Sequence, residues 1–132
     1  MWRRVWILSV LFVTACGRKA PPPEFAPTLA GVWQLKMTQS FPPGSAPEPI
    51  GRQGARAWWR ASYAGPGSAT VELYELASSA AGLDLVQRWR PVADTVVWYT
   101  PRYFVVVRWQ SQDRNAVAEF IRALQKQYAE EK

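Results

Sequence analysis

Carboxylates are the residues of this chain whose spacing could support hydrolysis. The 132 residues contain no histidine and a single cysteine, Cys16. Histidine-based nucleophilic triads and zinc sites of the cysteine–histidine kind are therefore excluded, because the residues that they need are missing. What remains is a pair of carboxylates of the kind that glycoside hydrolases use. The nearest candidates for such a pair are Glu72 and Glu75.

The spacing of these two carboxylates argues against a hydrolytic site. Glu72 and Glu75 lie three positions apart in a predicted strand, so their side chains point to opposite faces of a sheet. We interpret both as solvent-facing strand carboxylates. Gly51, Gly54 and Gly65 lack the lysine and the strand-to-helix context of a phosphate-binding loop. The sequence therefore predicts that the protein is not an enzyme, with no catalytic residue, no metal site and no cofactor.

Basic and aromatic side chains provide a candidate binding surface. Arg56, Trp58 and Arg60 fall on one side of a predicted strand. Arg108 lies on a strand that could be its neighbour. A tryptophan ring flanked by guanidinium groups can hold a sugar or an acidic polymer by stacking and bidentate hydrogen bonds. The alternative is that Trp58 or Trp59 is a core residue and that the arginines solubilise an exposed sheet face.

A second candidate is the segment 40–54 (SFPPGSAPEPIGRQG), which connects two predicted strands. It contains four prolines and three glycines. Loops of this length without regular structure are uncommon in compact domains and are usually functional or mobile. Phe41 and Ile50 could either dock the segment onto the domain or contact a partner.

The N-terminus has the parts of a secretory signal peptide in their usual order. Residues 1–4 (MWRR) are basic, residues 5–13 (VWILSVLFV) are almost entirely apolar, and small residues precede Cys16. Residues 13–16 (VTAC) resemble the bacterial lipobox and depart from its commonest form at the first two positions. The resemblance implies cleavage before Cys16, a diacylglycerol on its thiol and further acylation of the new amino group. Two or more acyl chains make a stable anchor, whereas one chain binds membranes only marginally.

This resemblance divides the chain into a signal peptide (1–15), a lipidated cysteine with a proline-rich tether (16–30) and one domain (31–132). The apolar run is too short for a transmembrane helix, which needs about 20 residues. We expect an exported protein on the periplasmic side of a membrane, with no nucleic-acid partner. Gly17 replaces the aspartate that often retains lipoproteins at the inner membrane, which favours the outer membrane where the source has two.

Hydrophobic periodicity in the domain predicts an α+β fold, an antiparallel sheet with two helices packed on it. Alternating or β-branched residues predict strands at 31–38, 55–63, 70–76, 95–99 and 103–110. In the first of these strands, Trp33, Leu35 and Met37 are expected on one face. The turn signal at residues 65–67 (GPG) predicts a hairpin between the second and third strands.

Two helices are expected on this sheet. The shorter begins at Ser78 or Ser79 and runs towards Arg90, although Gly82 weakens it. The longer follows Asp113, which is a natural N-cap. Its apolar stripe consists of Val117, Phe120, Ile121, Leu124 and Tyr128.

Residues 59–132 resemble an uncharacterised bacterial family of exported domains of unknown function. Within this range the resemblance rests on the strand 71–76 (VELYEL) and on the strand 103–107 (YFVVV) followed by an amphipathic helix. Trp33, before this range, is similar to a tryptophan near the domain start of the family. These are hydrophobic patterns of low specificity. They imply the same α+β layout and bring no activity with them.

Two functions from different classes remain open. The first is a lipid-anchored accessory protein that contacts an envelope partner through the segment 40–54 or an exposed sheet edge. The alternative is a module that binds a glycan or another anionic envelope ligand through Arg56, Trp58, Arg60 and Arg108. Salt should weaken the arginine-dependent contact, because it screens exposed charges, and should spare an apolar one.

The predicted lipid anchor can be tested on Cys16. A Cys16→Ser variant lacks the thiol that accepts the lipid, so we expect the protein to leave the membrane fraction or to keep its signal peptide. Fractionation and intact mass of the mature protein measure both outcomes. A Cys16→Ser protein that stays membrane-bound at its normal processed size would contradict the anchor.

Overall fold

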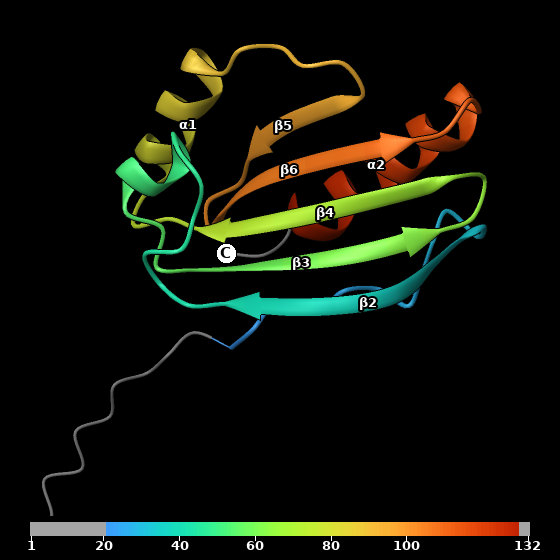
Figure 1. Cartoon of the computed structure of the whole chain (residues 1–132), viewed down its shortest axis with the longest axis horizontal. Coiled ribbons are helices and arrows are strands. Elements are labelled where there is room, and N and C mark those ends of the chain that lie inside the picture. Colours follow the sequence, from blue (N-terminus) through green and yellow to red (C-terminus); the bar gives the residue numbers. More distant parts are fainter. Residues whose placement is uncertain (1–20, 130–132) are drawn as a thin grey trace, which may run out of the picture.

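The computed structural model describes residues 21–129 (Figure 1). The predicted signal peptide and Cys16 lie outside the described residues, so cleavage and lipidation stay predictions. Among the described residues, no helix combines the length and the apolar character needed to cross a membrane.

An antiparallel sheet of six strands is the frame of the fold (Figure 1). Its spatial order is β1-β2-β3-β4-β6-β5, and every neighbouring pair is antiparallel. The strands are β1 (Thr28–Leu29), β2 (Trp33–Phe41), β3 (Ala57–Ala64), β4 (Ser68–Glu75), β5 (Thr95–Tyr99) and β6 (Tyr103–Gln110). The predicted α+β fold is confirmed, with β1 as an additional strand. The two residues of β1, directly after Pro27, are too short a pattern to predict a strand from the sequence.

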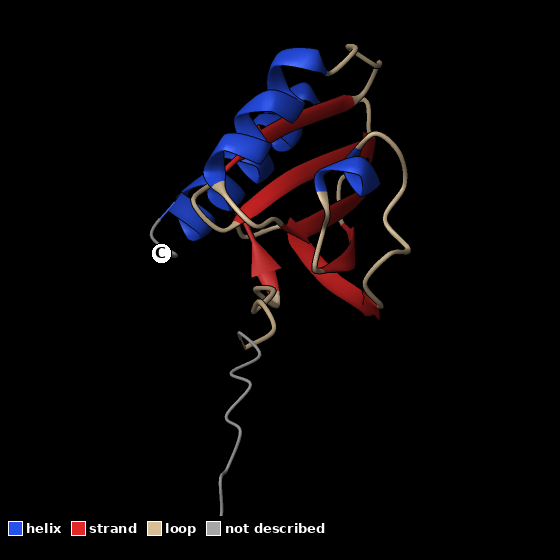
Figure 2. Ribbon diagram, turned by 90° about the vertical axis from the view of Figure 1, so that its left-hand side faces the viewer, coloured by secondary structure: helices blue, strands red, loops and turns tan. Residues whose placement is uncertain are grey.

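Helices cover both faces of this sheet. Helix α2 (Arg114–Ala129) packs on one face, which we call the α2 face. Helix α1 (Ser79–Arg88) and a single 3-10 turn, η1 (Ile50–Gln53), pack on the opposite face, the α1 face. Figure 2 shows how strongly the strands twist between the elements packed around them.

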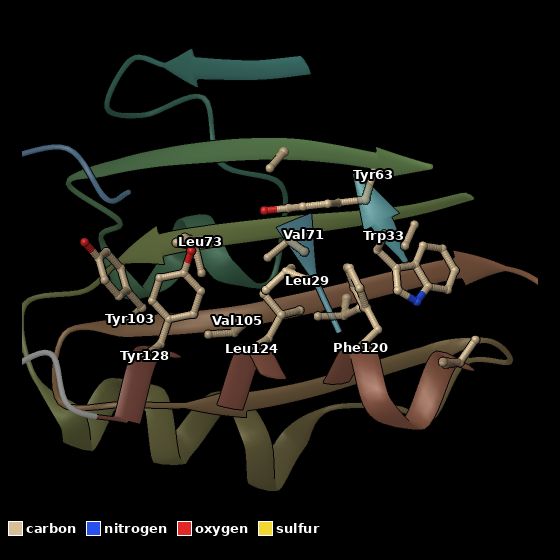
Figure 3. Close-up of a cluster of buried hydrophobic side chains, with 14 residues drawn as sticks. Leu29, Trp33, Tyr63, Val71, Leu73, Tyr103, Val105, Phe120, Leu124 and Tyr128 are labelled. Atoms are coloured by element: carbon tan, nitrogen blue, oxygen red, sulfur yellow. The ribbon is translucent and has the colours of Figure 1, made fainter. Parts of the chain in front are cut away.

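The larger core lies between the sheet and α2 (Figure 3). The carboxylate of Asp113 caps the helix as predicted, because its Oδ1 accepts the N–H of Ala116 at 3.0 Å. Trp33 closes one end of the core, with its ring centre 4.9 Å from that of Phe120. The buried residues of α2 are Val117, Phe120, Leu124 and Tyr128, with Ile121 half-buried at the margin of this predicted stripe.

Residues 21–30, which the sequence pattern assigned to the tether, are packed against the domain. The carbonyl of Glu24 accepts a hydrogen bond from the Tyr128 hydroxyl at 3.0 Å. The carbonyl of Ala26 accepts one from the Tyr63 hydroxyl at 2.8 Å. β1 then pairs with β2 and adds Leu29 to the core. The folded unit therefore starts before residue 31, because these backbone carbonyls find donors on the α2 face.

A one-residue irregularity in β2 changes the face to which its second half points. Leu35 pairs with Tyr63 across the strands. Met37 pairs with Ser62, which leaves Lys36 without a partner in the ladder. Directly paired residues share a face, so Leu35 points to the α2 face and Met37 to the α1 face, where Met37 is exposed. The predicted regular alternation, which placed Met37 beside Leu35, is wrong because it did not include a bulge.

Helix α1 approaches β5 closely because of a glycine. The Ser78 hydroxyl caps the helix as predicted and accepts the N–H of Ala81 at 3.3 Å. Gly82 is buried, and a Cβ at this position would lie 2.7 Å from the Cβ of Tyr99. Gly82, which lowers the helix propensity of this segment, is thus the residue at which α1 contacts the sheet.

Replacing Gly82 with alanine should destabilise the protein, although alanine is the better helix former. Helix propensity alone favours the variant by about 1 kcal/mol. The added methyl group overpacks the contact with Tyr99, which costs about 1–3 kcal/mol, so we expect a net loss of stability. Urea unfolding measures the difference. Leu83→Ala, on the exposed side of the same turn, is the control and should change stability by no more than about 0.5 kcal/mol. A higher midpoint for Gly82→Ala would refute the close approach.

Candidate functional site

The strand register arranges the α1-face side chains in rows across the sheet. Directly paired residues of antiparallel strands point to the same face, so each row can be read from successive pairings. The ring centres of Phe41 and Trp58 are 3.8 Å apart, and those of Trp58 and Tyr74 are 5.0 Å apart. Such stacks stabilise strand pairing beyond the area that they bury. The complete first row is aromatic and consists of Phe41, Trp58, Tyr74, Phe104 and Tyr99.

Helix α1 and the segment 40–54 cover this aromatic row. Ile50 is fully buried and shares a core cluster with Leu85 of α1. The indole Nε1 of Trp58 donates to the Ser45 Oγ at 2.9 Å. Trp58, a predicted binding residue, is thus a core residue that is 5% exposed. Phe41 and Ile50, two further candidates, hold the segment against the sheet.

A buried carboxylate lies in the second row, which consists of Gln39, Arg60, Glu72, Val106 and Val97. Glu72 of β4 is 2% exposed, and its Oε2 accepts the Tyr74 hydroxyl at 2.9 Å. The Nη2 of Arg60 lies 3.3 Å from the same oxygen. The Nη1 of Arg108 pairs with the other oxygen, Oε1. The interpretation of Glu72 as solvent-facing is therefore wrong. Its burial is possible because Arg60 and Arg108, on the two neighbouring strands, balance its charge and the Tyr74 hydroxyl donates a hydrogen bond to it.

The guanidinium group of Arg60 is fixed by aromatic rings as well as by Glu72. Its Cζ lies 5.1 Å from the ring centre of Phe41 and 5.3 Å from that of Trp58, within cation–π range. Burial, and secondarily the nearby Glu72 carboxylate, raise the pKa of the Tyr74 hydroxyl. This hydroxyl therefore stays protonated and remains a donor to Glu72. Burial likewise raises the pKa of Tyr63, on the opposite face, to about 12.

The third row of the α1 face opens to solvent. The side chain of Arg108 is 49% exposed, and Met37 is exposed to a similar degree. The sheet residues packed beneath α1 and the segment 40–54 come from the first two rows. About half of the α1 face is therefore open, with basic and hydroxyl side chains on it. The third row consists of Met37, Ser62, Thr70, Arg108 and Thr95.

Arg56, the remaining predicted binding residue, is not part of this cluster. It precedes β3, where its backbone N–H donates to the Glu75 carbonyl at 2.9 Å and its side chain is exposed. Four strand residues span about 13 Å, so the buried Trp58 separates Arg56 from Arg60. The structure brings Arg60 and Arg108 together and leaves Arg56 apart from them, just before the start of β3.

A hollow of about 520 Å³ adjoins Arg108 on the open half of the α1 face. Residues of β4 and β6 form one wall, and the turn before β5 forms the other. The lining residues are Ser68, Ala69, Thr70, Ala93, Asp94, Arg108, Trp109 and Gln110.

The outer edge of β2 is a second accessible feature. β1 pairs with β2 only at Trp33 and Gln34. Within the described residues, 37–41 pair with β3 on one side and with no strand on the other. Unpaired backbone groups of an edge strand are a template for another strand. A hollow of about 400 Å³ beside this edge is lined by Pro22, Pro23, Phe25, Thr38, Gln39, Ser40 and Trp59.

Glu75, the other carboxylate of the Glu72–Glu75 pair, also forms an ion pair with an arginine. Glu75 lies 3.2 Å from the Nη2 of Arg102. Its strand partner is Tyr103, a residue of the α2-face core, so Glu72 and Glu75 point to opposite faces as predicted. In the part of the chain that the structure describes, no three histidine, cysteine or acidic residues are grouped so that they could hold a metal ion.

Comparison of the chain with protein families, with curated proteins and with solved structures finds no match in any of the three. The resemblances to lipoproteins and to an exported domain family therefore stay predictions. The features of the described residues that could serve a function are the Arg60–Glu72–Arg108 cluster and the free edge of β2.

Removing both arginines should reveal the cost of burying Glu72. Arg60→Met together with Arg108→Met keeps most of the side-chain volume and leaves the carboxylate with Tyr74 alone. Leaving a buried charge without its ion-pair partners costs about 3–5 kcal/mol. We therefore expect the free energy of unfolding, measured in urea, to fall by this amount. Adding Glu72→Gln removes the charge but keeps an acceptor for Tyr74, and this triple variant should recover most of the stability.

The matched control removes two exposed arginines of surface ion pairs. Arg88 pairs with Asp84, and Arg122 pairs with Glu119. Arg88→Met together with Arg122→Met should change stability by less than about 2 kcal/mol, because each such pair contributes at most about 1 kcal/mol. If the cluster variant is no less stable than this control, Glu72 is not a buried charge that depends on its arginines.

Proposed function

We propose that the protein is a lipid-anchored, non-enzymatic interaction module of the bacterial cell envelope that holds a partner protein by the outer edge of β2. The basic, apolar and small-residue order before Cys16 supports export and anchoring. The absence of histidine from the sequence and the pairing of Glu72 and Glu75 with arginines support a role without catalysis. The segment 40–54 is docked on the sheet, so the edge is the better candidate for the contact.

The observation that carries this proposal is the outer edge of residues 37–41, which pairs with no strand among the described residues. From Met37 to Phe41 it contains no charged residue and no proline, which are the usual devices that protect an edge strand. An extended segment of the partner adds to β2 as a further strand through main-chain hydrogen bonds. One of its apolar side chains enters the neighbouring hollow against Trp59 and Phe25.

Photo-crosslinking in the native cell tests this contact. A probe at Thr38, on the free edge, should capture one partner protein through an extended segment, whereas a probe at Lys126 on α2 should not. Hydrogen exchange of the reconstituted complex should then show protection of residues 36–41. A Thr38→Lys/Ser40→Lys variant places two cations beside the hollow and should lose the capture.

The matched control places the same two charges elsewhere, as Gln110→Lys/Gln112→Lys, and should keep the capture. Equal capture from Thr38 and Lys126, or a partner that protects other residues, would overturn the edge contact. Capture of a second copy of this chain would replace the partner with self-association through β2.

A further inference from the structure

The ion-pair cluster on the α1 face carries more positive charge than Glu72 can neutralise. Arg60 and Arg108 both bind this single carboxylate. Within the described residues, Glu72 is the only carboxylate paired with either arginine. Two guanidinium groups and one carboxylate leave the ion-pair cluster itself with a net positive charge.

Both arginines keep hydrogen-bond donors for a ligand. Each guanidinium has five N–H donors, and Glu72 engages only one nitrogen of each group. The side chains of Arg60 and Arg108 are 37% and 49% exposed, so their other donors can reach solvent. Glu72 holds both groups, and the rings of Phe41 and Trp58 flank Arg60. Because the donors are oriented in advance, binding an anion costs less conformational entropy.

The hollow beside Arg108 suits a neutral polar group next to that anion. Ser68, Thr70 and Gln110 offer hydroxyl and amide groups along one wall. Asp94 on the other wall accepts hydrogen bonds and repels further negative charge. The ligand that fits both parts has one anionic group and a body rich in hydroxyls, rather than negative charge along its whole length.

We infer that the open half of the α1 face is a binding site for an acidic saccharide. Its carboxylate or phosphate group binds the outward N–H donors of Arg108 and Arg60, and its hydroxyls enter the hollow lined by Thr70 and Asp94. Carboxylate and phosphate share this guanidinium chemistry, and the two sources are separated by the probes below. This site lies on a different surface from the β2 edge contact and does not depend on it.

Titrations of the purified full-length protein in detergent micelles, followed by NMR of backbone amides and arginine Nε–H groups, test the site. The probes are glucuronate, glucose 6-phosphate, neutral glucose and inorganic phosphate. Glucuronate or glucose 6-phosphate should shift the signals of Arg60, Arg108 and Thr70 in a saturable way, and the tighter of the two identifies the anionic group. Glucose alone should bind at least about tenfold more weakly, because it lacks the charge-assisted bonds.

Two variants separate the two halves of the site. Arg108→Gln should weaken the tighter acidic sugar at least about tenfold, the loss expected for one charge-assisted contact. Thr70→Val should weaken the acidic sugar and leave inorganic phosphate unchanged, since it alters only the hollow. Arg90→Gln, an exposed arginine outside the site, is the control and should leave every affinity unchanged. Unchanged amide spectra away from the site establish that each variant is folded.

Three outcomes would overturn the inference. Glucose that binds as tightly as glucuronate and glucose 6-phosphate would remove the role of the arginines. Inorganic phosphate that binds as tightly as glucose 6-phosphate would reduce the site to a nonspecific anion contact. A folded Arg108→Gln protein with wild-type affinity would mean that the arginine pair serves only to neutralise Glu72. None of these results bears on partner capture at Thr38.

Discussion

The burial of Glu72 is the constraint around which the α1 face is organised. A carboxylate in the middle of a sheet is tolerated only when nearby charges and donors compensate for its lost hydration. Tyr74 supplies a donor, and Arg60 and Arg108 supply the charge from the two neighbouring strands. Both arginines keep part of their side chains in water, so the face around them is open and basic.

The two faces of the sheet differ because their coverings differ in extent. Helix α2 has 16 residues, and with residues 21–30 it closes the α2 face over a continuous core. Helix α1 has 10 residues and spans only about 15 Å. Together with the segment 40–54 it covers the aromatic row and stops before the arginines. The proline-rich segment thus completes a small second core, which explains why Phe41 and Ile50 are turned inward.

The packed N-terminal segment changes how an anchored domain would be presented. Backbone carbonyls of residues 24 and 26 accept hydrogen bonds from buried tyrosines, and β1 joins the sheet. A tether predicted to run from Cys16 to residue 30 is thereby reduced to the few residues before Pro21. Lipid on Cys16 would then hold the domain close to the membrane surface.

Local patterns in the sequence determined the helices, their caps, five strands and the α+β class, because periodicity and capping act over a few residues. The turn at residues 65–67 also determines that Arg60 lies opposite Glu72. Both residues are six positions from Pro66, and a tight hairpin pairs positions that are equally far from its turn. Only the tertiary structure decided that Arg108 joins them from β6, that the bulge at Lys36 turns Met37 outward, and that Trp58 lies beneath a loop. These outcomes depend on contacts between residues far apart in the chain, where total burial and the pairing of charges outweigh any local preference.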